Sequence, residues 1–352
     1  MSVGVQRLRD EPDVIRTGAL DKGEDATLVD TALGLDARRR ALLGEADALK
    51  AERNTASKQV GEAIKAGAAP GGPEVAALRA ASVAAGERIA ALDVEIGRIE
   101  AELEDALLRI PNPADPDVPV GDASANVTVR TWGDLLPRTV AAPGARGFGA
   151  DPAAPAWERR PHWDVAERLG IFELERGAKI AGSGFPVYRG AGAGLQRALI
   201  DFFLGVHTRE NGFTEIWPPA VVNAASARGT GQIPDKEDQM YVVTRDELYL
   251  VPTAEVPVTN LHRDEIFEAD QLPVHYAAYS PCFRREAGAA GKDTRGILRV
   301  HQFDKVEMVL FEKPADSPAA LEWMVGRAEA VFTTTGGQIS VIPCSRVWTP
   351  MK

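Results

Sequence analysis

The sequence predicts an α+β protein in which a long antiparallel helical hairpin precedes a domain built on a β-sheet. Two stretches with apolar residues at every seventh position, 28–66 and 74–110, are separated by a turn rich in Gly and Pro. Further along, two β-like apolar segments, 274–279 and 306–311, frame a charged hairpin at 283–307. The first pattern is typical of an antiparallel coiled coil, and the second of two paired strands joined by a loop that folds over a ligand.

The helical hairpin rests on two heptad repeats. The repeat of the first helix is Leu28, Leu35, Leu42, Leu49, Ala56 and Ala63. The second helix has one stripe with Leu78, Ala85, Leu92, Ile99 and Ala106, and another with Ser82, Ile89, Ile96, Leu103 and Ile110. At 1.5 Å per residue each helix is roughly 55 Å long. We therefore expect an arm that reaches well beyond a globular domain.

The first helix of this arm is more basic than the second. Its cations between residues 38 and 65 outnumber its acids, whereas residues 95–105 are acidic. Ordinary charge pairing on a solvated coiled coil accounts for this pattern, and so does a basic surface that follows a nucleic-acid backbone. The candidate contacts to nucleic acid are Arg38, Arg39, Arg40, Lys50, Arg53 and Lys58.

Length and composition narrow the class of protein. With 352 residues the chain is long enough for two domains, and its net charge of −11 argues against a general nucleic-acid coat but not against a local basic face. No apolar run approaches the roughly 20 residues of a membrane helix, and the N-terminus lacks the features of a secretion signal. The two cysteines, Cys282 and Cys344, belong to no Cys/His cluster, so no metal ligand is assigned. We expect a reduced, cytoplasmic setting.

Three regions are predicted along the chain. Residues 1–110 form an N-terminal domain with the helical arm, residues 111–160 a linker rich in Pro, Ala and Gly, and residues 161–352 the second domain. In the second domain the apolar face of residues 193–211 predicts a helix that ends at Gly212. The segment that follows, up to Pro219, predicts a strand that two prolines terminate.

The charged hairpin carries the side chains that a nucleotide needs. Arg284 and Arg285 offer bidentate donors for phosphate, and Phe303 offers a flat face on which a base can stack. Each residue taken singly also fits a plain structural role, as a charge on a strand surface or a ring in the core. Their occurrence in one hairpin, together with Glu286, favours a nucleotide site. His301, in the same hairpin, is expected to be structural.

Taken together, these motifs resemble those of bacterial-type seryl-tRNA synthetases. The resemblance covers about residues 5–332, and many separate motifs agree with it in order and spacing. Beside the helical arm, its main carriers are Gly212-Phe213 through Pro219, Thr253-Ala254-Glu255, Phe283-Arg-Arg-Glu-Ala-Gly, and Arg299-Val-His-Gln-Phe303 with Glu307. Further matching strings are His162-Trp163, Arg176-Gly-Ala-Lys179, Gly229-Thr-Gly-Gln232 and Gly291-Lys-Asp-Thr-Arg-Gly296.

The resemblance implies a fold, a reaction and partners. The second domain would be a class II catalytic domain, an antiparallel sheet flanked by helices, that forms a homodimer through the 212–219 region. The protein would activate serine with ATP and magnesium to give seryl-adenylate, and would transfer the seryl group to tRNA(Ser) and also to tRNA(Sec). The arm would grip the tRNA through its backbone and shape.

The resemblance also assigns roles to single residues. Arg284 would hold the α-phosphate of ATP, Glu286 would meet the adenine amino group or orient that arginine, and Phe303 would stack on adenine. The expected catalytic residues are Arg284, Glu286 and Arg299. The expected ATP-binding residues are Arg284, Arg285, Glu286, Val300 and Phe303. The expected serine-binding residues are Thr253, Ala254, Glu255 and Glu307, of which Glu307 would bind the ammonium group.

Residues 333–352 do not continue this resemblance. The third class II motif, a Gly-rich segment with an arginine, is not recognised there. The sheet is therefore expected to be incomplete, and aminoacylation by this chain weak or absent. A frameshifted or truncated reading frame is the hypothesis for this change of character. Resequencing the gene tests it, since an unbroken frame with the same ending contradicts it.

Two alternatives compete with a serine–tRNA ligase. One is a catalytically inactive relative that keeps the tRNA-binding arm, which the missing third motif favours and the complete hairpin opposes. The other is a ligase that loads an amino acid onto a carrier protein, which the long heptad arm opposes.

Overall fold

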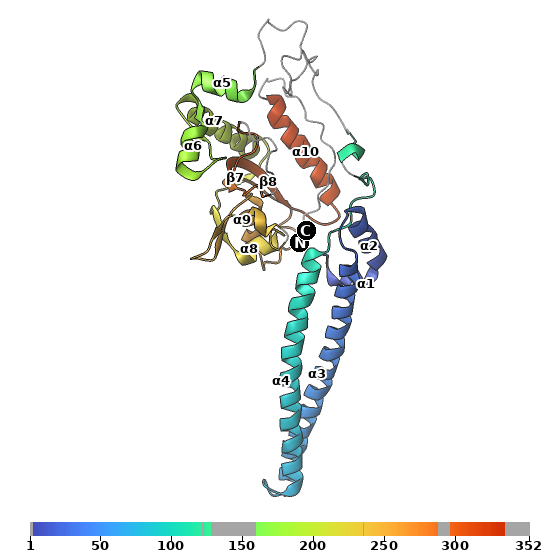
Figure 1. Ribbon diagram of the computed structural model, residues 1–352. Coiled ribbons are helices and arrows are strands. Elements are labelled where there is room, and N and C mark those ends of the chain that lie inside the picture. Colours follow the sequence, from blue (N-terminus) through green and yellow to red (C-terminus); the bar gives the residue numbers. More distant parts are fainter. Residues whose placement is uncertain (1–2, 122, 128–159, 235, 288–295, 335–352) are drawn as a thin grey trace. The chain divides into compact units, whose positions relative to one another are not determined.

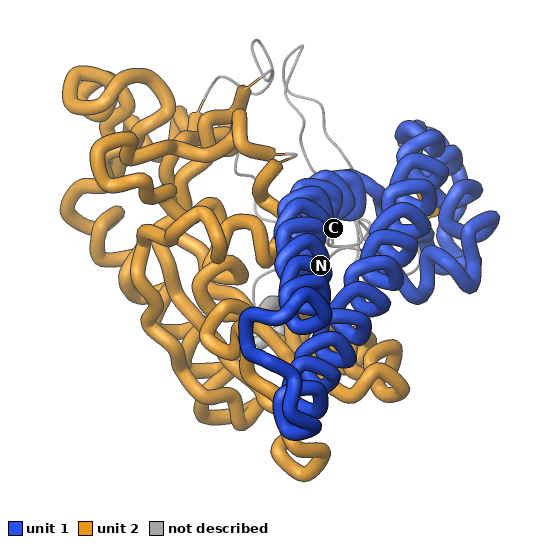
Figure 2. The backbone as a smooth tube through the Cα atoms, turned by 90° about the horizontal axis from the view of Figure 1, so that it is seen from below, with its two compact units in different colours: residues 1–125, 348–352 blue, residues 126–347 orange. Residues whose placement is uncertain are grey.

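A computed structural model describes residues 3–121, 123–127, 160–234, 236–287 and 296–334 of the chain (Figure 1). These residues fall into two compact units, which divide after Ala125 (Figure 2). Most of the predicted linker, the turn of the charged hairpin and nearly all of the segment after residue 332 lie outside the described residues. Within the described part, no helix is both long and apolar enough to cross a membrane.

The first unit contains the predicted helical hairpin. Helix α3 spans Thr27–Lys65 and helix α4 spans Pro73–Arg109, so each lies within one residue of its expected range. Pro73 stands at the start of α4, where its missing N–H removes no helical hydrogen bond. The buried residues of α4 follow the predicted stripes and include Ile89, Leu92, Ile96, Ile99, Leu103 and Ala106. The antiparallel pairing that the heptads predict is confirmed.

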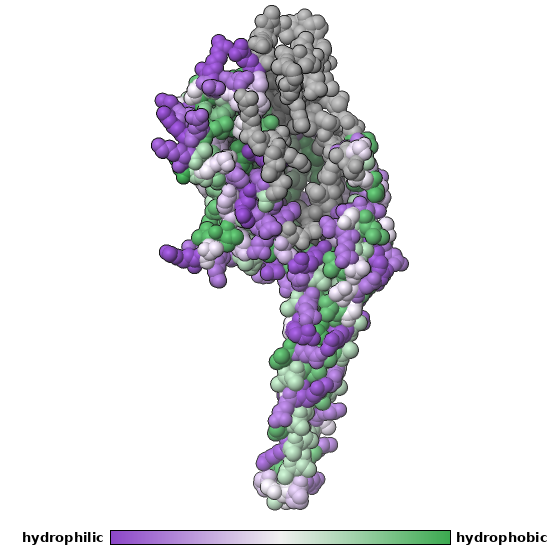
Figure 3. Space-filling view, in the orientation of Figure 1, coloured by the Kyte–Doolittle hydropathy of each residue, from purple (hydrophilic) through white to green (hydrophobic). Residues whose placement is uncertain are grey.

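The base of the hairpin packs against two short helices, α1 (Val5–Asp10) and α2 (Pro12–Asp21). A short 3₁₀ turn, η1 (Ala123–Ala125), completes the described part of this unit. The core here combines residues from all four helices: Val3, Leu8, Ile15, Val29, Ala32, Leu103, Ala106, Leu107 and Ile110. A second, smaller core of Ala46, Leu92 and Ile96 lies further along the arm. The visible face of the arm mixes hydrophilic and apolar residues (Figure 3).

A buried carboxylate interrupts the apolar interface at the base of the arm. Asp36 on α3 is only 1% exposed. Arg9 on α1 donates two hydrogen bonds to it, from Nε at 2.7 Å and Nη2 at 2.8 Å. Arg40 and Arg39, one turn further along α3, lie at 3.1 and 3.3 Å. The hydrogen bonds from Arg9 lower the pKa of Asp36 from 3.8 to about 2, against the opposing effect of burial.

The main sheet of the second unit has the order β3-β7-β8. Its strands are β3 (Thr214–Ile216), β7 (Val274–Phe283) and β8 (Gln302–Phe311). Strands β7 and β8 pair antiparallel over ten residues, as the charged hairpin predicts. Strand β3 instead pairs parallel with β7, so the sheet is mixed rather than wholly antiparallel. The long chain between β3 and β7 makes this possible, because parallel strands need a crossover connection.

Among the described residues of the second unit there are also two smaller sheets and six α-helices. One sheet pairs β4 (Val221–Asn223) and β5 (Val242–Val243) with the central β6 (Leu248–Leu250), and the other pairs β1 (Phe172–Glu173) with β2 (Val187–Tyr188). The helices are α5 (His162–Leu169), α6 (Leu174–Ala181), α7 (Ala191–Gly205), α8 (Ala224–Gly229), α9 (Glu255–Thr259) and α10 (Ser317–Thr334). The described part of the second unit also contains a π-helical turn, η2 (Val206–Glu210), and two 3₁₀ turns, η3 (Glu237–Gln239) and η4 (Asn260–His262).

The helix expected at 193–211 is present, but its last turn differs. Helix α7 ends at Gly205, and Val206–Glu210 continue as a π-helical turn before Gly212 (φ 73°) redirects the chain into β3. Phe202 and Phe203 are half-buried, whereas Leu195 and Leu199 of the predicted apolar face are exposed in the single chain. That face is therefore only partly covered.

Candidate active site

Three side chains of the candidate site lie on one face of the β7–β8 ribbon. Phe303, Lys305 and Glu307 alternate along β8, so they point to the same side of the sheet. The residues paired with them on β7 are Cys282, Ser280 and Ala278, all fully buried and all small. Because the side chains of β7 are small at these positions, the longer side chains of β8 have room to contact the start of α9. Ala254, just before this helix, and Val258 within it pack on Ala278.

The predicted serine-binding residues are brought together at the start of α9. The Thr253 hydroxyl donates to Glu307 Oε2 at 2.7 Å, and the Glu255 backbone N–H donates to the same oxygen at 3.1 Å. Ala254 lies between them, fully buried, as the residue before the first turn of α9. These contacts join residues more than 50 positions apart, which the motifs alone did not predict.

The carboxylates of Glu255 and Glu307 differ in their surroundings. Burial, and then the negative charge of Glu307, raise the pKa of Glu255, whereas Lys305 opposes the shift. Lys305 Nζ donates to Thr253 Oγ1 at 2.7 Å and to Glu307 Oε1 at 3.0 Å. Lys305 was not among the predicted site residues, although its place between Phe303 and Glu307 in the alternating pattern of β8 was a signal that could have identified it.

Arg284 links the predicted ATP-binding residues to the cluster of Thr253, Glu255 and Glu307. Its Nε donates to the backbone oxygen of Pro252 at 3.3 Å, one residue before Thr253. Its guanidinium lies over the Phe303 ring, 5.0 Å from the ring centre. The cation expected to hold phosphate and the ring expected to stack on adenine are therefore in contact.

Arg285 lies apart from this pair. Its backbone N–H donates to the oxygen of Gln239 at 2.9 Å, and its guanidinium donates to the oxygen of Asp238 at 3.3 Å. Gln239 also holds Ala287, with its side-chain amide nitrogen donating to the Ala287 oxygen and its side-chain oxygen accepting from the Ala287 N–H, both at 3.1 Å. Arg285 thus fastens turn η3 to the hairpin, and no contact of the described residues joins it to Arg284 or Phe303. No sequence signal singled out Gln239.

Glu286 and Arg299 face each other across the base of the hairpin loop. Arg299 Nη1 donates to Glu286 Oε2 at 2.5 Å. Glu286 has a φ of 51°, a left-handed conformation in which the chain leaves strand β7 sharply. Glu286 therefore pairs with Arg299 in this structure, and its expected contact to adenine or to Arg284 stays a prediction. Val300, next to Arg299, is buried.

His301 fixes the backbone of Arg284. Its ring Nδ1 lies 2.9 Å from the Arg284 oxygen, so the Nδ1–H donates, and the Arg284 N–H donates in turn to the His301 oxygen at 2.9 Å. The His301 N–H donates to the oxygen of Gly184 at 2.8 Å, and the Phe185 ring stacks on the imidazole. Gly184 has a φ of 81°, and a Cβ there would collide with the His301 ring. This is the structural role that was expected of His301.

On the opposite face of the ribbon, Asp304 forms side-chain hydrogen bonds that no motif predicted. Asp304 accepts from the Tyr279 hydroxyl and from the Gln196 amide of α7, both at 2.8 Å. Burial, and then the hydrogen bond to Asp304, raise the pKa of Tyr279 to about 12. These contacts dock α7 on the sheet and so support the hairpin from behind.

Four of the six candidate nucleic-acid contacts on α3 are paired within the arm. Arg38 pairs with Glu95 at 2.5 Å, Arg39 and Arg40 with Asp36, and Lys50 with Asp47 at 3.7 Å. Arg53 and Lys58 form no ion pair within the described part of the chain. The cations nearer the tip of the arm are thus the ones available to an outside anion.

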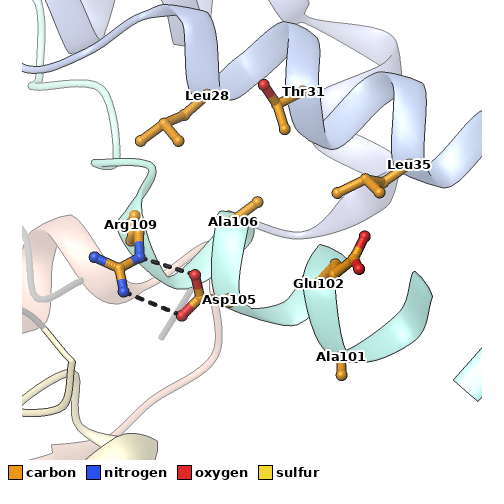
Figure 4. Close-up of a pocket in the computed structure, with 8 residues that line it drawn as sticks. All are labelled: Leu28, Thr31, Leu35, Ala101, Glu102, Asp105, Ala106 and Arg109. Carbon is orange, nitrogen blue, oxygen red and sulfur yellow. Dashed lines mark hydrogen bonds and ion pairs between the residues drawn. The ribbon is translucent and has the colours of Figure 1, made fainter. Parts of the chain in front are cut away.

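A pocket of about 570 Å³ lies between the bases of α3 and α4 (Figure 4). Leu28 and Leu35 form its apolar wall on α3, and Asp105 and Arg109 are joined by an ion pair at its edge. None of the predicted ATP or serine residues lines it. Among the described residues, no group of three or more His, Cys, Asp or Glu side chains is placed to hold a metal ion.

Two family models match the sequence. The model of the seryl-tRNA synthetase N-terminal domain matches residues 4–114. The model of the class II core domain of tRNA synthetases (G, H, P, S and T) matches residues 241–351. The second match extends past residue 332, near which the sequence resemblance was expected to end.

Single proteins agree with these matches. The chain is 46% identical to the serine–tRNA ligase of Gemmatimonas aurantiaca over 93% of this chain and 73% of the relative. It is 47% identical to that of Chlorobium luteolum over 93% and 72%. Among solved structures, seryl-tRNA synthetase from Pyrococcus horikoshii complexed with ATP gives a TM-score of 0.80 at 34% identity, covering 94% of this chain and 74% of that one.

The mixed sheet with its charged hairpin, together with these matches, defines a class II aminoacyl-tRNA synthetase. Within that class the helical arm is the distinguishing feature. The chain belongs to the seryl-tRNA synthetase family. The sequence-based identification of the family is therefore confirmed.

Proposed function

We propose that this protein is a serine–tRNA ligase, which activates serine with ATP and transfers the seryl group to tRNA(Ser). The observation that carries the proposal is the junction at Pro252 and Thr253. Arg284 donates to the backbone oxygen of Pro252. The next residue, Thr253, donates to Glu307, which also accepts from the Glu255 N–H. A cation suited to phosphate and a carboxylate pair suited to an ammonium group are therefore adjacent.

This arrangement fits the first half of the reaction. The serine carboxylate attacks the α-phosphorus of ATP and pyrophosphate leaves, so negative charge gathers where the two substrates meet. Arg284 would stabilise that charge, and Phe303 would stack on the adenine. In the ligand-free chain Arg284 covers a face of the Phe303 ring. ATP binding would exchange this cation–π contact for contacts to phosphate and base.

Magnesium enters this proposal as part of the Mg–ATP substrate. Glu286, the carboxylate of the hairpin nearest the expected phosphates, is occupied by Arg299. Because the described residues contain no ready cluster of metal ligands, no residue of the chain is assigned to the ion. The ion would neutralise phosphate charge that the arginines leave uncompensated.

Exchange of pyrophosphate into ATP tests the proposal directly. We expect exchange that depends on serine and is much weaker with threonine, alanine or glycine. Calorimetry with a non-hydrolysable seryl-adenylate analogue tests the same site without turnover. Aminoacylation assays then compare tRNA(Ser) with tRNA(Sec), which we propose as a second acceptor. A chain that binds neither ATP nor the analogue contradicts the proposal.

The arm is proposed to hold the tRNA through Arg53 and Lys58. We expect Arg53→Ala with Lys58→Ala to weaken tRNA binding about tenfold at low salt, and to reduce the slope of log affinity against log salt by about 2. Filter binding across a salt series measures both quantities. Arg98→Ala on α4, where Arg98 pairs with Glu102, is the matched control. An unchanged slope in the double variant would place the tRNA elsewhere.

We also propose a homodimer through the region that begins at Gly212. Trp217 is 80% exposed in the single chain and Leu195 is 55% exposed, although large apolar side chains are usually covered. Sedimentation at micromolar concentration measures the assembly, and a monomer contradicts the proposal. Since ATP and tRNA are substrates of the cytoplasm, we place the reaction there.

A further inference from the structure

Lys305 joins the hydrogen-bonded cluster of Thr253, Glu255 and Glu307. Its Nζ lies 2.7 Å from Thr253 Oγ1 and 3.0 Å from Glu307 Oε1. The side chains of Lys305 and Glu307 are 28% and 21% exposed, so the pair is largely removed from water. In such surroundings a charge-assisted hydrogen bond is stronger than on an open surface.

The hydrogen bonds of Thr253 have only one consistent direction. An ammonium group can only donate, so Thr253 Oγ1 accepts from Lys305, and it also accepts from the Glu255 N–H at 3.2 Å. The hydroxyl proton must therefore point to Glu307 Oε2, 2.7 Å away. Lys305 thereby fixes the rotation of the Thr253 hydroxyl.

The same contacts leave the two carboxylates with different tasks. Glu307 accepts from Lys305, from Thr253 and from the Glu255 N–H. The carboxylate of Glu255 accepts no hydrogen bond from the described residues, although it is largely buried. Lys305, and after it Lys236, oppose the raised pKa of Glu255, and a substrate ammonium would supply a further positive charge and the hydrogen bonds that this carboxylate lacks.

We propose that Lys305 is a positioning residue for serine: it holds the Glu307 carboxylate in place, turns the Thr253 hydroxyl toward Glu307, and leaves the Glu255 carboxylate for the substrate ammonium. This inference rests on the proposed function. It adds Lys305, which the motifs did not contain, and it assigns the substrate ammonium to Glu255 rather than to Glu307, to which the resemblance had assigned it.

The test is serine binding to the full chain by calorimetry, with ATP measured separately. Lys305→Met removes the charge and the donors at nearly constant length, and we expect the Kd for serine to rise about tenfold or more. The Kd for ATP should stay within about twofold. Lys305→Arg keeps the charge and should recover part of the lost affinity. Lys313→Met, at an exposed position after β8, is the matched control and should change neither value.

The possible outcomes separate the two ideas. If the unaltered chain binds ATP but not serine, the proposed function fails. If it binds serine and Lys305→Met binds it equally well, only the Lys305 inference is overturned. An equal loss of ATP and serine affinity also overturns it, because a general disturbance of the site then explains the result. Should Lys305→Met not fold, Lys305→Gln retains two donors without the charge and is judged by the same criteria.

Discussion

Replacing Arg284 by alanine is expected to lower serine-dependent pyrophosphate exchange by about 100- to 1,000-fold, the usual effect of removing one donor aimed at developing charge. Arg284 is the cation that contacts both the Phe303 ring and the backbone next to the serine pocket. Its loss should weaken ATP binding as well, which calorimetry measures independently of turnover. Arg284→Lys should recover little, because lysine lacks the planar fork that binds phosphate bidentately.

The neighbouring arginine is the natural control. Arg285 has the same charge and side chain, but it binds the backbone of Asp238 and Gln239. We expect Arg285→Ala to lower the exchange rate by less than about tenfold, mainly by loosening turn η3. If Arg285→Ala loses as much activity as Arg284→Ala, the placement of the phosphate contact is wrong.

Replacing Asp36 by alanine is expected to destabilise the arm by about 2–3 kcal/mol. Removing one partner of a fully buried ion pair costs about 3–5 kcal/mol, but Arg9 and Arg40 are partly exposed and will be partly solvated after the change. Urea unfolding of the full chain, followed by far-ultraviolet circular dichroism, measures the effect. Asp47→Ala, which removes a surface ion pair with Lys50 on the same helix, should cost less than about 1 kcal/mol.

The contribution of Asp36 also predicts a pH dependence. Its pKa is about 2 in the folded chain against 3.8 ordinarily, a difference of about 2 kcal/mol. Because the folded pKa is the lower one, this stability is fully present above about pH 4 and is lost as the pH falls towards 2. The difference in unfolding free energy between the unaltered chain and Asp36→Asn should shrink over that window. A constant difference would show that the carboxylate charge does not matter.

The parts of the fold that the sequence predicted are those with a repeating pattern. The heptad stretches match the observed extents of α3 and α4 to within one residue, and in α4 the predicted stripes also contain most of the buried residues. The hairpin strands β7 and β8 were recognisable from their apolar flanks. The parallel pairing of β3 was not, because pairing direction depends on a crossover that leaves no mark within the strand itself. The buried ion cluster at Asp36 was not predicted either, because its three arginine partners come from two separate helices.

In the candidate site, too, some residues were predicted from the sequence and others were found only in the structure. Motifs named Thr253, Glu255, Arg284, Phe303 and Glu307, and the structure brings these residues together. Motifs also named Arg285, since neighbouring residues look alike in a sequence. Both arginines follow the end of β7, so no strand pattern predicts that Arg285 contacts the backbone of Asp238 and Gln239 while Arg284 contacts Phe303. Lys305 and Gln239 are contacts between distant segments, and their roles follow from distances rather than from residue type.

The ion cluster at Asp36 lies at the base of the arm, so a small change in its geometry is magnified along the length of α3. About 29 residues separate Asp36 from the end of α3 at Lys65, so the free length is ~44 Å at 1.5 Å per residue. A tilt of ~5° between α1 and α3 would move the tip by ~4 Å, more than the length of one hydrogen bond. Arg53 and Lys58 stand on the outer part of α3. If Arg53 and Lys58 bind tRNA phosphates as proposed above, the two hydrogen bonds from Arg9 to Asp36 help to fix where these cations lie.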